Sequence, residues 1–341
     1  MQKKTLIIGG GVAGICLAHQ LTQRNEAFNL VDDGKNVSSV VAAGIVHAMS
    51  FRRTLLSWNA MPFYKESETF YKGVESTLNT NFFHPLIVRR LFSSPEEALI
   101  WKQRLNDSAF QPFLREYSAE DERFGPYGSG CVDGFWIDSK AFISESLHDL
   151  SKRKLLLSDT VTADNFNPNT LEYKGITYDA VVLALGYKSK ETPWFLNVPV
   201  NPTKGQLLTV NWNNPVENTS LHRKAFALPI GGNAFKIGST YEWNDTSPEP
   251  TEEGRERILN NATSITTDPL EVIDHTAGIR PTTPDRRPVL ARHQTYKQLF
   301  IFNGLGSKGY MLAPSLAKQL SEAIIENKPL AEELNPSRFN S

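Results

Sequence analysis

Three glycines near the start of the chain have the spacing of a phosphate-binding turn. Gly9, Gly11 and Gly14 form a G-x-G-x-x-G pattern directly after residues 3–8, which predict a short buried strand. In such a turn the first glycine permits a tight bend, the second lets backbone approach a pyrophosphate, and the third lets the next helix pack on the strand. The helix N-terminus then offers free N–H groups and a positive dipole end to the phosphates.

A carboxylate follows at the distance expected for a ribose ligand. Residues 27–31 predict a second strand, and Asp32 comes directly after it, 18 residues beyond Gly14. An acid at this place hydrogen-bonds the ribose of an adenine dinucleotide in many proteins. Asp33 is the competing acid, and Asp32 is favoured because it directly follows the apolar run. The alternative is a strand–turn–helix without nucleotide, but the complete strand–glycine–helix context favours dinucleotide binding.

The elements that must position these residues change in kind along the chain. Strands and helices alternate at first, which predicts an α/β fold, whereas short strands separated by turns over 202–241 predict an antiparallel sheet in a second, α+β domain. The predicted helices are 15–23, 57–78, 95–106, 139–152, 251–264 and 313–326, the last with Pro314 in its first turn. The predicted strands include 154–157, 159–163, 178–186 and 298–304, with a hairpin over 165–176 that turns at 167–169.

Composition bounds the class of protein. The 341 residues, 40% of them hydrophobic, suffice for two domains with substantial cores. A formal net charge of −1 provides no global attraction to nucleic acid or membrane. Cys16 and Cys131 are too few for a disulfide framework, and no spacing of ligands predicts a metal site. No apolar run approaches the ~18 residues of a membrane span, and the run at 6–8 is too short for a signal peptide, so a cytoplasmic protein is expected.

Further motifs extend along almost the whole chain in one order. They are Ala42-Ala43-Gly44-Ile45, the strand 181–186 ending in Gly186, Pro202-x-x-Gly205-Gln206, Gly278-Ile279-Arg280-Pro281-x-x-Pro284-Asp285, and Gly304-Leu305-Gly306-Ser307-Lys308-Gly309. With the opening glycines, this order resembles the FAD-dependent D-amino acid oxidase superfamily, which includes glycine oxidase and sarcosine oxidase. The C-terminal part, to residues 336–339, looks most like the oxidase half of the bifunctional tRNA 5-methylaminomethyl-2-thiouridine biosynthesis enzymes.

The resemblance implies a fold and a cofactor. It implies an α/β chain with a Rossmann-like FAD-binding domain (GR2-type, FAD/NAD(P)-binding) and an interleaved α+β substrate domain built on an antiparallel sheet. We expect the FAD-binding domain to comprise residues 1–57, 132–200 and 274–341, and the substrate domain 58–131 and 201–273. Non-covalent FAD is expected, because relatives that tether the flavin use a cysteine near the C-terminal substrate region and none follows Cys131.

The resemblance also assigns FAD contacts residue by residue. The opening glycines hold the pyrophosphate, Asp32 the ribose, and Val161 the adenine through its backbone. Ser39 and the backbone of 43–45 lie along the ribityl chain and flavin, and 306–309 approach the pyrimidine edge of the flavin. The expected set is Gly9, Gly11, Val12, Ala13, Gly14, Asp32, Asp33, Ser39, Ala43, Gly44, Ile45, Val161, Ala184, Gly186, Arg280, Gly304, Gly306, Ser307, Lys308, Gly309 and Tyr310.

The family reaction is oxidation of an amine at the carbon next to nitrogen. A hydride passes to flavin N5, the resulting imine is hydrolysed, and oxygen commonly reoxidises the flavin. The cofactor carries the difficult chemistry and the protein orients the substrate. By resemblance Arg280 binds the substrate carboxylate, since guanidinium and carboxylate form a bidentate pair. The alternative is a structural arginine paired with an acid such as Asp285.

Three further side chains are candidates for the catalytic site. Lys308 could stabilise the negative charge that develops on the reduced flavin, or it could simply face solvent. His47 follows the flavin-facing loop and could act as a base, although a lone histidine is more often structural. Tyr241, at the end of the second-domain sheet, could line the pocket or merely pack. Trp58 and Arg52 are weaker candidates.

The expected activity is therefore that of an FAD-dependent amine or amino acid oxidase or dehydrogenase. One alternative is an NAD(P)H-dependent flavin reductase, although we find no second G-x-G-x-x-G for a nicotinamide cofactor. Another is an oxidase that processes carboxymethylaminomethyl groups on the tRNA wobble uridine, for which the near-neutral charge supplies no strong RNA-binding face. A flavin-binding subunit without catalysis is disfavoured by the presence of Arg280. The expected partners are a small amine and oxygen or another electron acceptor, with no membrane; the substrate, the acceptor and the oligomeric state are open.

Overall fold

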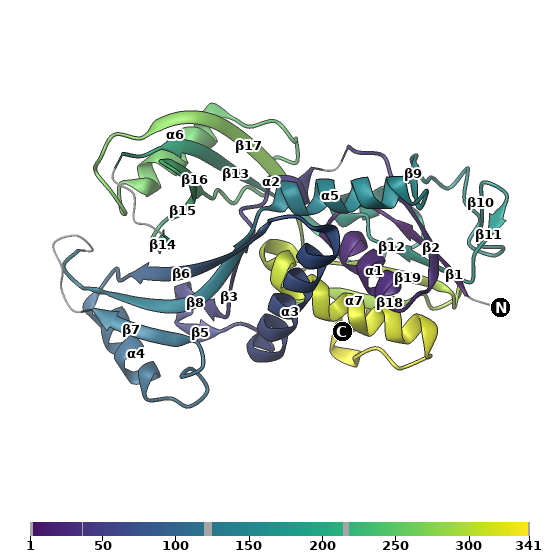
Figure 1. Ribbon diagram of the computed structural model, residues 1–341, viewed down its shortest axis with the longest axis horizontal. Helices are drawn as coiled ribbons and strands as arrows, with labels where there is room; N and C mark the ends of the chain where they lie inside the picture. Colours follow the sequence, from purple (N-terminus) through teal and green to yellow (C-terminus); the bar gives the residue numbers. More distant parts are fainter. Residues whose placement is uncertain (1–2, 36, 119–124, 214–217, 340–341) are drawn as a thin grey trace.

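The computed structural model describes residues 3–35, 37–118, 125–213 and 218–339. These residues form two large sheets that lie toward opposite ends of an elongated molecule (Figure 1). Both sheets draw strands from widely separated parts of the sequence, so the chain crosses between them several times. Residues that meet between the sheets therefore come from distant segments.

The first sheet is the predicted α/β unit. Its strands are β1 (Lys4–Ile8), β2 (Ala27–Asp32), β9 (Leu156–Ser158), β12 (Ala180–Leu183), β18 (Val289–Arg292) and β19 (Leu299–Asn303). They are arranged in the order β18-β19-β12-β1-β2-β9, and every neighbouring pair is parallel except β18 with β19. Central parallel strands are buried on both faces, which explains the uninterrupted apolar run 6–8 in β1.

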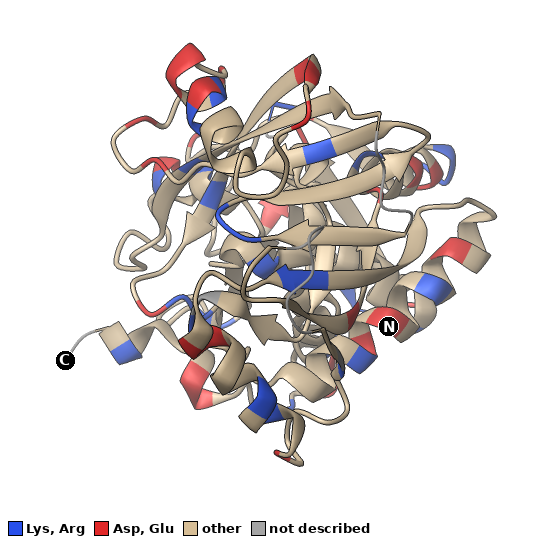
Figure 2. Cartoon of the chain, turned by 90° about the vertical axis from the view of Figure 1, so that its left-hand side faces the viewer, with Lys and Arg blue, Asp and Glu red and all other residues tan. Residues whose placement is uncertain are grey.

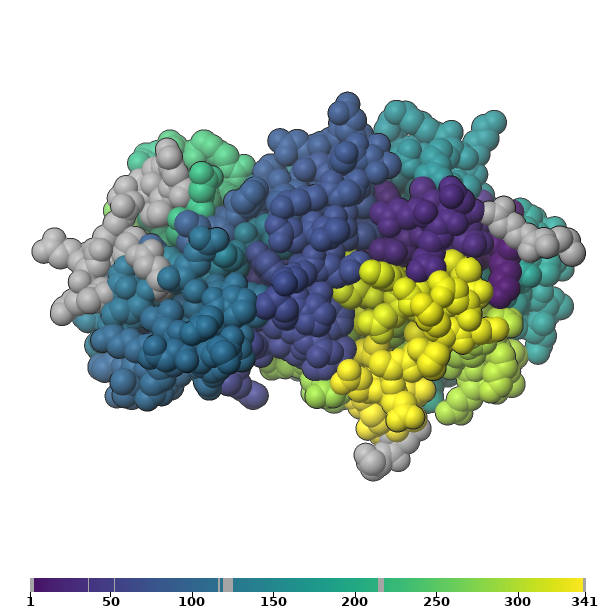
Figure 3. All heavy atoms as spheres, turned by 60° about the horizontal axis from the view of Figure 1, so that its bottom comes forward, coloured from purple at the N-terminus to yellow at the C-terminus, as the bar shows by residue number. Residues whose placement is uncertain are grey.

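Helices cover one face of this sheet. They are α1 (Val12–Gln23), α3 (Ala60–Leu78), α5 (Ser139–Lys152) and α7 (Gly309–Ile325). Their apolar sides form one continuous core with the sheet, in which α7 packs against both α1 and α3. Figure 3 shows the dark blue residues of α3 lying against the yellow C-terminal residues. Irregular segments and the small hairpin β10 (Glu172–Tyr173) and β11 (Ile176–Thr177) cover the opposite face.

The second sheet has nine strands and is almost entirely antiparallel. They are β3 (Ile45–His47), β6 (Phe83–Leu91), β7 (Leu114–Ser118), β8 (Ser129–Ile137), β13 (Asn201–Asn211), β14 (Thr219–His222), β15 (Phe226–Gly231), β16 (Ala234–Gly238) and β17 (Glu271–Thr282). The order is β17-β13-β16-β15-β14-β6-β8-β3, with β7 also paired to β8. Only β6 with β14 is parallel, which is an exception to the antiparallel prediction.

Two shorter helices pack on this second sheet, and each begins at a residue whose side chain caps its N-terminus. Helix α4 (Pro95–Leu105) begins after Ser94, whose hydroxyl accepts a hydrogen bond from Glu97 N, with Pro95 in its first turn. Helix α6 (Glu252–Ala262) is capped in the same way by Thr251. Among the described residues, none of the helices is both long and apolar enough to cross a membrane.

Three local predictions are wrong. Residues 159–163 are not a strand, because β9 ends at Ser158 and the chain then turns. The hairpin bends at 174–175, where Lys174 and Gly175 adopt positive φ, rather than at 167–169. Helix α7 begins at Gly309, so Pro314 lies inside it and its missing N–H leaves one backbone hydrogen bond unmade.

The domain boundaries stay a prediction. Strand pairing shows which of the segments that they define contribute strands to the nine-stranded sheet. Residues 132–137 and 274–282, which the boundaries group with the nucleotide-binding segments, pair within the nine-stranded sheet, as does β3. Strand β17 therefore runs in the second sheet up to Thr282, and the chain enters the first sheet only at β18. This crossing places Arg280 between the sheets.

Candidate functional site

The opening glycines adopt the conformations that their spacing predicts. Gly9 has a φ of +116°, and a Cβ there would lie 2.4 Å from the carbonyl oxygen of Ala184. A Cβ on Gly14 would lie 1.9 Å from the carbonyl oxygen of Gly9, so only glycine lets α1 pack this closely on the turn. Gly11 faces a pocket, and a Cβ there would lie 3.1 Å from Ser39 Oγ. The first and third glycines thus shape the turn, while the second leaves room in front of it.

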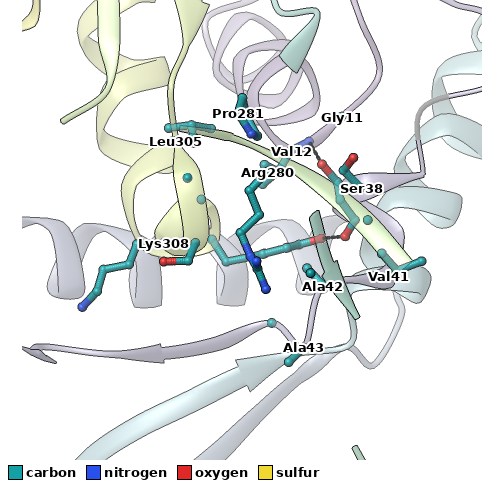
Figure 4. Close-up of a pocket in the computed structure, with 18 of the residues that line it drawn as sticks. Gly11, Val12, Ser38, Val41, Ala42, Ala43, Arg280, Pro281, Leu305 and Lys308 are labelled. Atoms are coloured by element: carbon teal, nitrogen blue, oxygen red, sulfur yellow. Dashed lines mark hydrogen bonds between the residues drawn. The ribbon is translucent and has the colours of Figure 1, made fainter. Parts of the chain in front are cut away.

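The N-terminus of α1 is open toward this pocket. Its N-cap, Gly11, has no side chain, and its first turn contains no acidic residue. Val12 N donates to Ser39 Oγ at 3.0 Å, a contact marked in Figure 4. Because a helix N-terminus attracts negative charge, this arrangement suits a phosphate.

Asp32 and Asp33 lie beside the turn, outside the residues that line the pocket. Asp32 Oδ2 accepts a hydrogen bond from Gly10 N at 2.5 Å, which fixes the carboxylate against the glycine turn at the end of β2. Asp33 Oδ2 lies 3.8 Å from Lys188 Nζ. Val161 is buried close by in the core on this side of the sheet. The ribose and adenine contacts of these residues stay predictions.

A pocket of about 340 Å³ lies between the two sheets in front of α1. The predicted residues that line it are Gly11, Val12, Ala13, Ser39, Ala43, Gly44, Ile45, His47, Ala184, Gly186, Tyr241, Arg280, Gly306, Ser307, Lys308, Gly309 and Tyr310. Gly304 does not line it; its φ of +73° turns the chain from β19 into the lining segment. The structure thus brings together most of the residues that the sequence analysis singled out.

The pocket wall has the properties that a flat anionic cofactor needs. Backbone and small side chains form much of it, including residues 42–44, Gly278 and Gly306. Its charged side chains are Arg280 and Lys308, and the described lining contains no carboxylate. Small residues admit close contact with a ring system, and the cations with the α1 N-terminus favour phosphates and negative charge on a ring. The residues present therefore fit FAD.

Arg280 lies in the pocket as a partly buried cation. Its guanidinium donates to the carbonyl oxygen of Thr240 at 3.1 Å and to Ser239 Oγ at 2.9 Å, and no salt bridge to a carboxylate is found in the described part of the chain. Burial lowers its pKa, and the nearby Tyr241 and Glu242 oppose this effect. An arginine nevertheless remains protonated in proteins. Asp285, the acid considered as a structural partner, instead accepts from Arg338 at 2.8 Å.

Two neighbours hold the guanidinium in this position. The ring centre of Tyr241 lies 4.4 Å from Arg280 Cζ, a cation–π contact. On the other side, Gly205 in β13 provides space, since a Cβ there would lie 2.0 Å from Arg280 Nη2. The motif around Gly205 is visible in the sequence, but its pairing with β17 was needed to show what the glycine faces.

Lys308 is partly buried, and its ammonium is hydrogen-bonded within the chain. Its ammonium donates to the carbonyl oxygen of Met49 at 3.0 Å and to the hydroxyl of Ser57. Burial lowers its pKa to about 8. In Figure 4 the Lys308 ammonium points away from Arg280. The side chain therefore links the start of α7 to the hairpin of β4 (Met49–Ser50) and β5 (Leu55–Leu56), while its stem lines the pocket. The role of Lys308 beside the flavin stays a prediction.

Two partly buried histidines form another part of the lining. His47 stacks on Phe51 with ring centres 4.6 Å apart, and its buried Nδ1 has no hydrogen-bond partner among the described residues. Burial, followed by Lys308 and His222, holds its pKa well below the usual range. Burial lowers the pKa of His222 to about 3, and a 2.8 Å hydrogen bond joins its Nε2 to Ser220 Oγ. Both imidazoles are therefore neutral at neutral pH.

Of the remaining candidates, one lines the pocket and the others do not contribute a described side chain to it. Tyr241 lines the pocket and is 53% exposed, so it stands at the entrance. Trp58 does not line the pocket and donates to Glu333 at 3.2 Å. The side chain of Arg52 lies outside the described residues. Lining residues that the sequence analysis did not assign include Gly205, His222, Ser239 and Asn303. The last three sit in no motif, so only the fold could identify them.

Comparisons with known proteins agree with this geometry. The model of the DAO family, described as FAD dependent oxidoreductase, matches residues 4–323. Glycine oxidase of Bacillus subtilis (strain 168) is 23% identical over 99% of this chain and 97% of its own length. The crystal structure of glycine oxidase from Geobacillus kaustophilus superposes with a TM-score of 0.84 and 19% identity, covering 99% of both chains. At this identity the superposition establishes a common fold.

Other relatives are longer proteins. The bifunctional protein ThiO/ThiG of Trichormus variabilis is 24% identical over 99% of this chain but only 55% of its own length. A tRNA 5-methylaminomethyl-2-thiouridine biosynthesis bifunctional protein of Legionella pneumophila is 22% identical over 99% of this chain and 57% of its own. The chain thus spans about half the length of these bifunctional relatives.

Proposed function

The chain belongs to the family of FAD-dependent oxidoreductases, and we propose that it oxidises the C–N bond of a small amine or amino acid that carries a carboxylate. The observation that carries this proposal is Arg280, a partly buried cation in the pocket that makes no salt bridge within the described chain. Burying an unpaired charge is costly unless a ligand compensates it. A carboxylate is the ligand that fits a guanidinium in two hydrogen bonds.

FAD would lie along the residues that fit it. The N-terminus of α1 and Gly11 would hold the pyrophosphate, Asp32 the ribose, and the wall of residues 43–45 and 306–309 the flavin. When bound, FAD supplies a two-electron acceptor for a hydride from the carbon next to the amine nitrogen. The chain contributes a site that orients this carbon and limits access of water.

Five side chains would bind the substrate or shape its site. Arg280 binds the carboxylate, while Tyr241 and Ser239 keep its guanidinium in place. His47 is neutral and its Nδ1 has no partner among the described residues, so it can accept a hydrogen bond from the substrate amine. An amine without its extra proton gives up hydride more readily, because its lone pair stabilises the developing positive charge. Lys308 fixes the hairpin that follows His47 and adds positive charge to the wall.

The proposal is tested by anaerobic titration of the purified protein loaded with FAD. We expect the flavin absorption to bleach with glycine, N-alkylglycines or other small amino acids, and peroxide to form when oxygen is admitted. A matched amine without the carboxylate, such as methylamine beside glycine, should bleach the flavin far more weakly. The proposal would be overturned if none of these amines changed the flavin absorption while NADPH or modified tRNA bleached it. The first result would favour a reductase and the second a tRNA-processing oxidase.

A further inference from the structure

A second cavity, of about 730 Å³, adjoins the pocket at the end where Arg280 lies. The two cavities share His222, Phe226, Ser239 and Tyr241 in their linings. Ser239 is also a hydrogen-bond partner of Arg280. A ligand whose carboxylate meets Arg280 can therefore extend past these shared residues into the outer cavity. The space available for substrate is larger than glycine needs.

The outer cavity is richer in cations than the rest of the molecule. Its described lining contains Arg53, Arg90, Arg223 and Lys224 against Glu96 and Glu97, whereas the whole chain has a net charge of −1. Arg90 is paired with Glu97 at 2.7 Å, and Arg223 donates to backbone carbonyls, so both are structural. Arg53 and Lys224 are exposed, and neither forms a salt bridge within the described residues. These two side chains are available for a ligand.

The passage between the cavities is uncharged. It is formed by the rings of Tyr241, Phe226 and His222, and His222 is neutral because burial lowers its pKa to about 3. Cations therefore lie at both ends, with Arg280 inside and Arg53 and Lys224 outside. A ligand that complements this pattern has an anionic group at each end and an uncharged middle.

We propose that the outer cavity is a subsite for a second anionic group of the substrate, a carboxylate or a phosphate. This inference rests on the proposed function, since it takes Arg280 as the site of the first carboxylate. The substrate class is then an amine with a carboxylate next to the oxidised C–N bond and a second anion at its far end.

The distribution of charge around the cavity favours a small molecule over a polyanion. Figure 2 views the molecule from the end that holds the nine-stranded sheet and shows Lys and Arg interspersed with Asp and Glu. Binding of a nucleic acid backbone needs a continuous basic face. The positive lining of the outer cavity is local and matches one anionic group.

The test uses the FAD-loaded protein and thioether ligands, in which sulfur replaces the amine nitrogen so that no oxidation follows. The thioether (methylthio)acetate, CH3–S–CH2–COO−, called methylthioacetate below, carries one carboxylate. The compound 2,2′-thiodiacetate and its homologues with one or two further methylene groups carry two. The monoamide of each diacid keeps the length and removes the second charge. A phosphonate in place of the second carboxylate distinguishes the two kinds of anion. Binding is measured calorimetrically at low and high salt.

We expect at least one dianion to bind about tenfold tighter than its monoamide at low salt, with a smaller ratio at high salt. The double variant Arg53→Gln/Lys224→Gln should reduce this ratio toward one, while Lys152→Gln, an exposed lysine of α5 outside both cavities, should leave it unchanged. Equal affinity for dianions and monoamides, or a ratio that the double variant leaves intact, overturns the subsite. Failure of methylthioacetate and every other carboxylate to bind would instead refute the proposed function.

Discussion

Replacing Gly205 with alanine tests the role of Arg280 without touching the arginine itself. Gly205 lies in β13 opposite Gly278 of β17, and its backbone has no positive φ, so alanine is compatible with the strand. The added Cβ would lie 2.0 Å from Arg280 Nη2, 2.2 Å from Cζ and 2.3 Å from Nη1. The guanidinium must therefore leave its present position.

The displacement sets the size of the effect. To restore an ordinary contact of 3.4 Å, Nη2 must move by about 1.4 Å, which breaks its 2.9 Å hydrogen bond to Ser239 Oγ. A charge-assisted hydrogen bond contributes roughly 1.5–3 kcal/mol. Loss of about 2–3 kcal/mol of carboxylate binding corresponds to an affinity about 30- to 150-fold weaker.

The assay is the change in flavin absorption on titration with methylthioacetate. We expect the Gly205→Ala variant to retain FAD and to bind this ligand about 30- to 150-fold more weakly. Gly73→Ala is the matched control, since a Cβ at this helical glycine meets no atom within 4 Å. That variant should bind the ligand normally and gain slightly in stability, because alanine favours helix by about 1 kcal/mol.

A double-mutant cycle separates displacement of Arg280 from general damage to the sheet. In an Arg280→Leu background, the alanine at position 205 has no guanidinium to displace, so it should weaken ligand binding no further. Additive losses from the two substitutions would refute the reasoning. So would an unchanged affinity in the Gly205→Ala single variant.

Two further predictions concern the cofactor and Lys308. Gly11→Val should lose FAD during gel filtration, measured as flavin per protein, because a Cβ there already lies 3.1 Å from Ser39 Oγ in front of α1; full retention would place the pyrophosphate elsewhere. Burial lowers the pKa of Lys308 from 10.5 to about 8, so between these values the unfolded chain binds more protons than the folded one and stability rises with pH. The free energy of unfolding of the wild type relative to Lys308→Met, from urea titrations, should be constant below pH 8 and increase from pH 8 to 10.5; a flat difference would contradict a buried ammonium.

The sequence alone could predict the elements whose signals are local. The glycine turn, the apolar strand before it and the capped helix after Ser94 each follow from a few adjacent residues. Lining segments such as 42–45 and 306–309 lie in glycine-rich motifs that a resemblance can carry over. Local signals fail where two segments could both form a turn. The sequence predicts a hairpin that turns at 167–169, but it turns at Lys174 and Gly175, which adopt positive φ.

The rest of the site depends on pairings between distant strands. The contact of Gly205 with Arg280 exists because β13 pairs with β17, about 75 residues later in the chain. His222 reaches the pocket through the parallel pairing of β14 with β6, which nothing in its own surroundings indicates. Burial likewise decides the charge of His47 and cannot be read from its neighbours in sequence. Such residues can be assigned to the site only when the fold is known.

The strand order of the first sheet also has a consequence for how the chain is made. Strands β1 and β2 are complete once Asp32 has been added to the growing chain, but their sheet gains β18 and β19 only after Asn303 has been added. Until then the apolar β12 presents an unpaired edge, and such edges associate readily with other chains. Helix α7, which closes the pocket wall and covers the core, follows β19 in the chain and is made later still. The cofactor site can therefore be completed only after β19 and the lining segment 306–309 have been added to the chain.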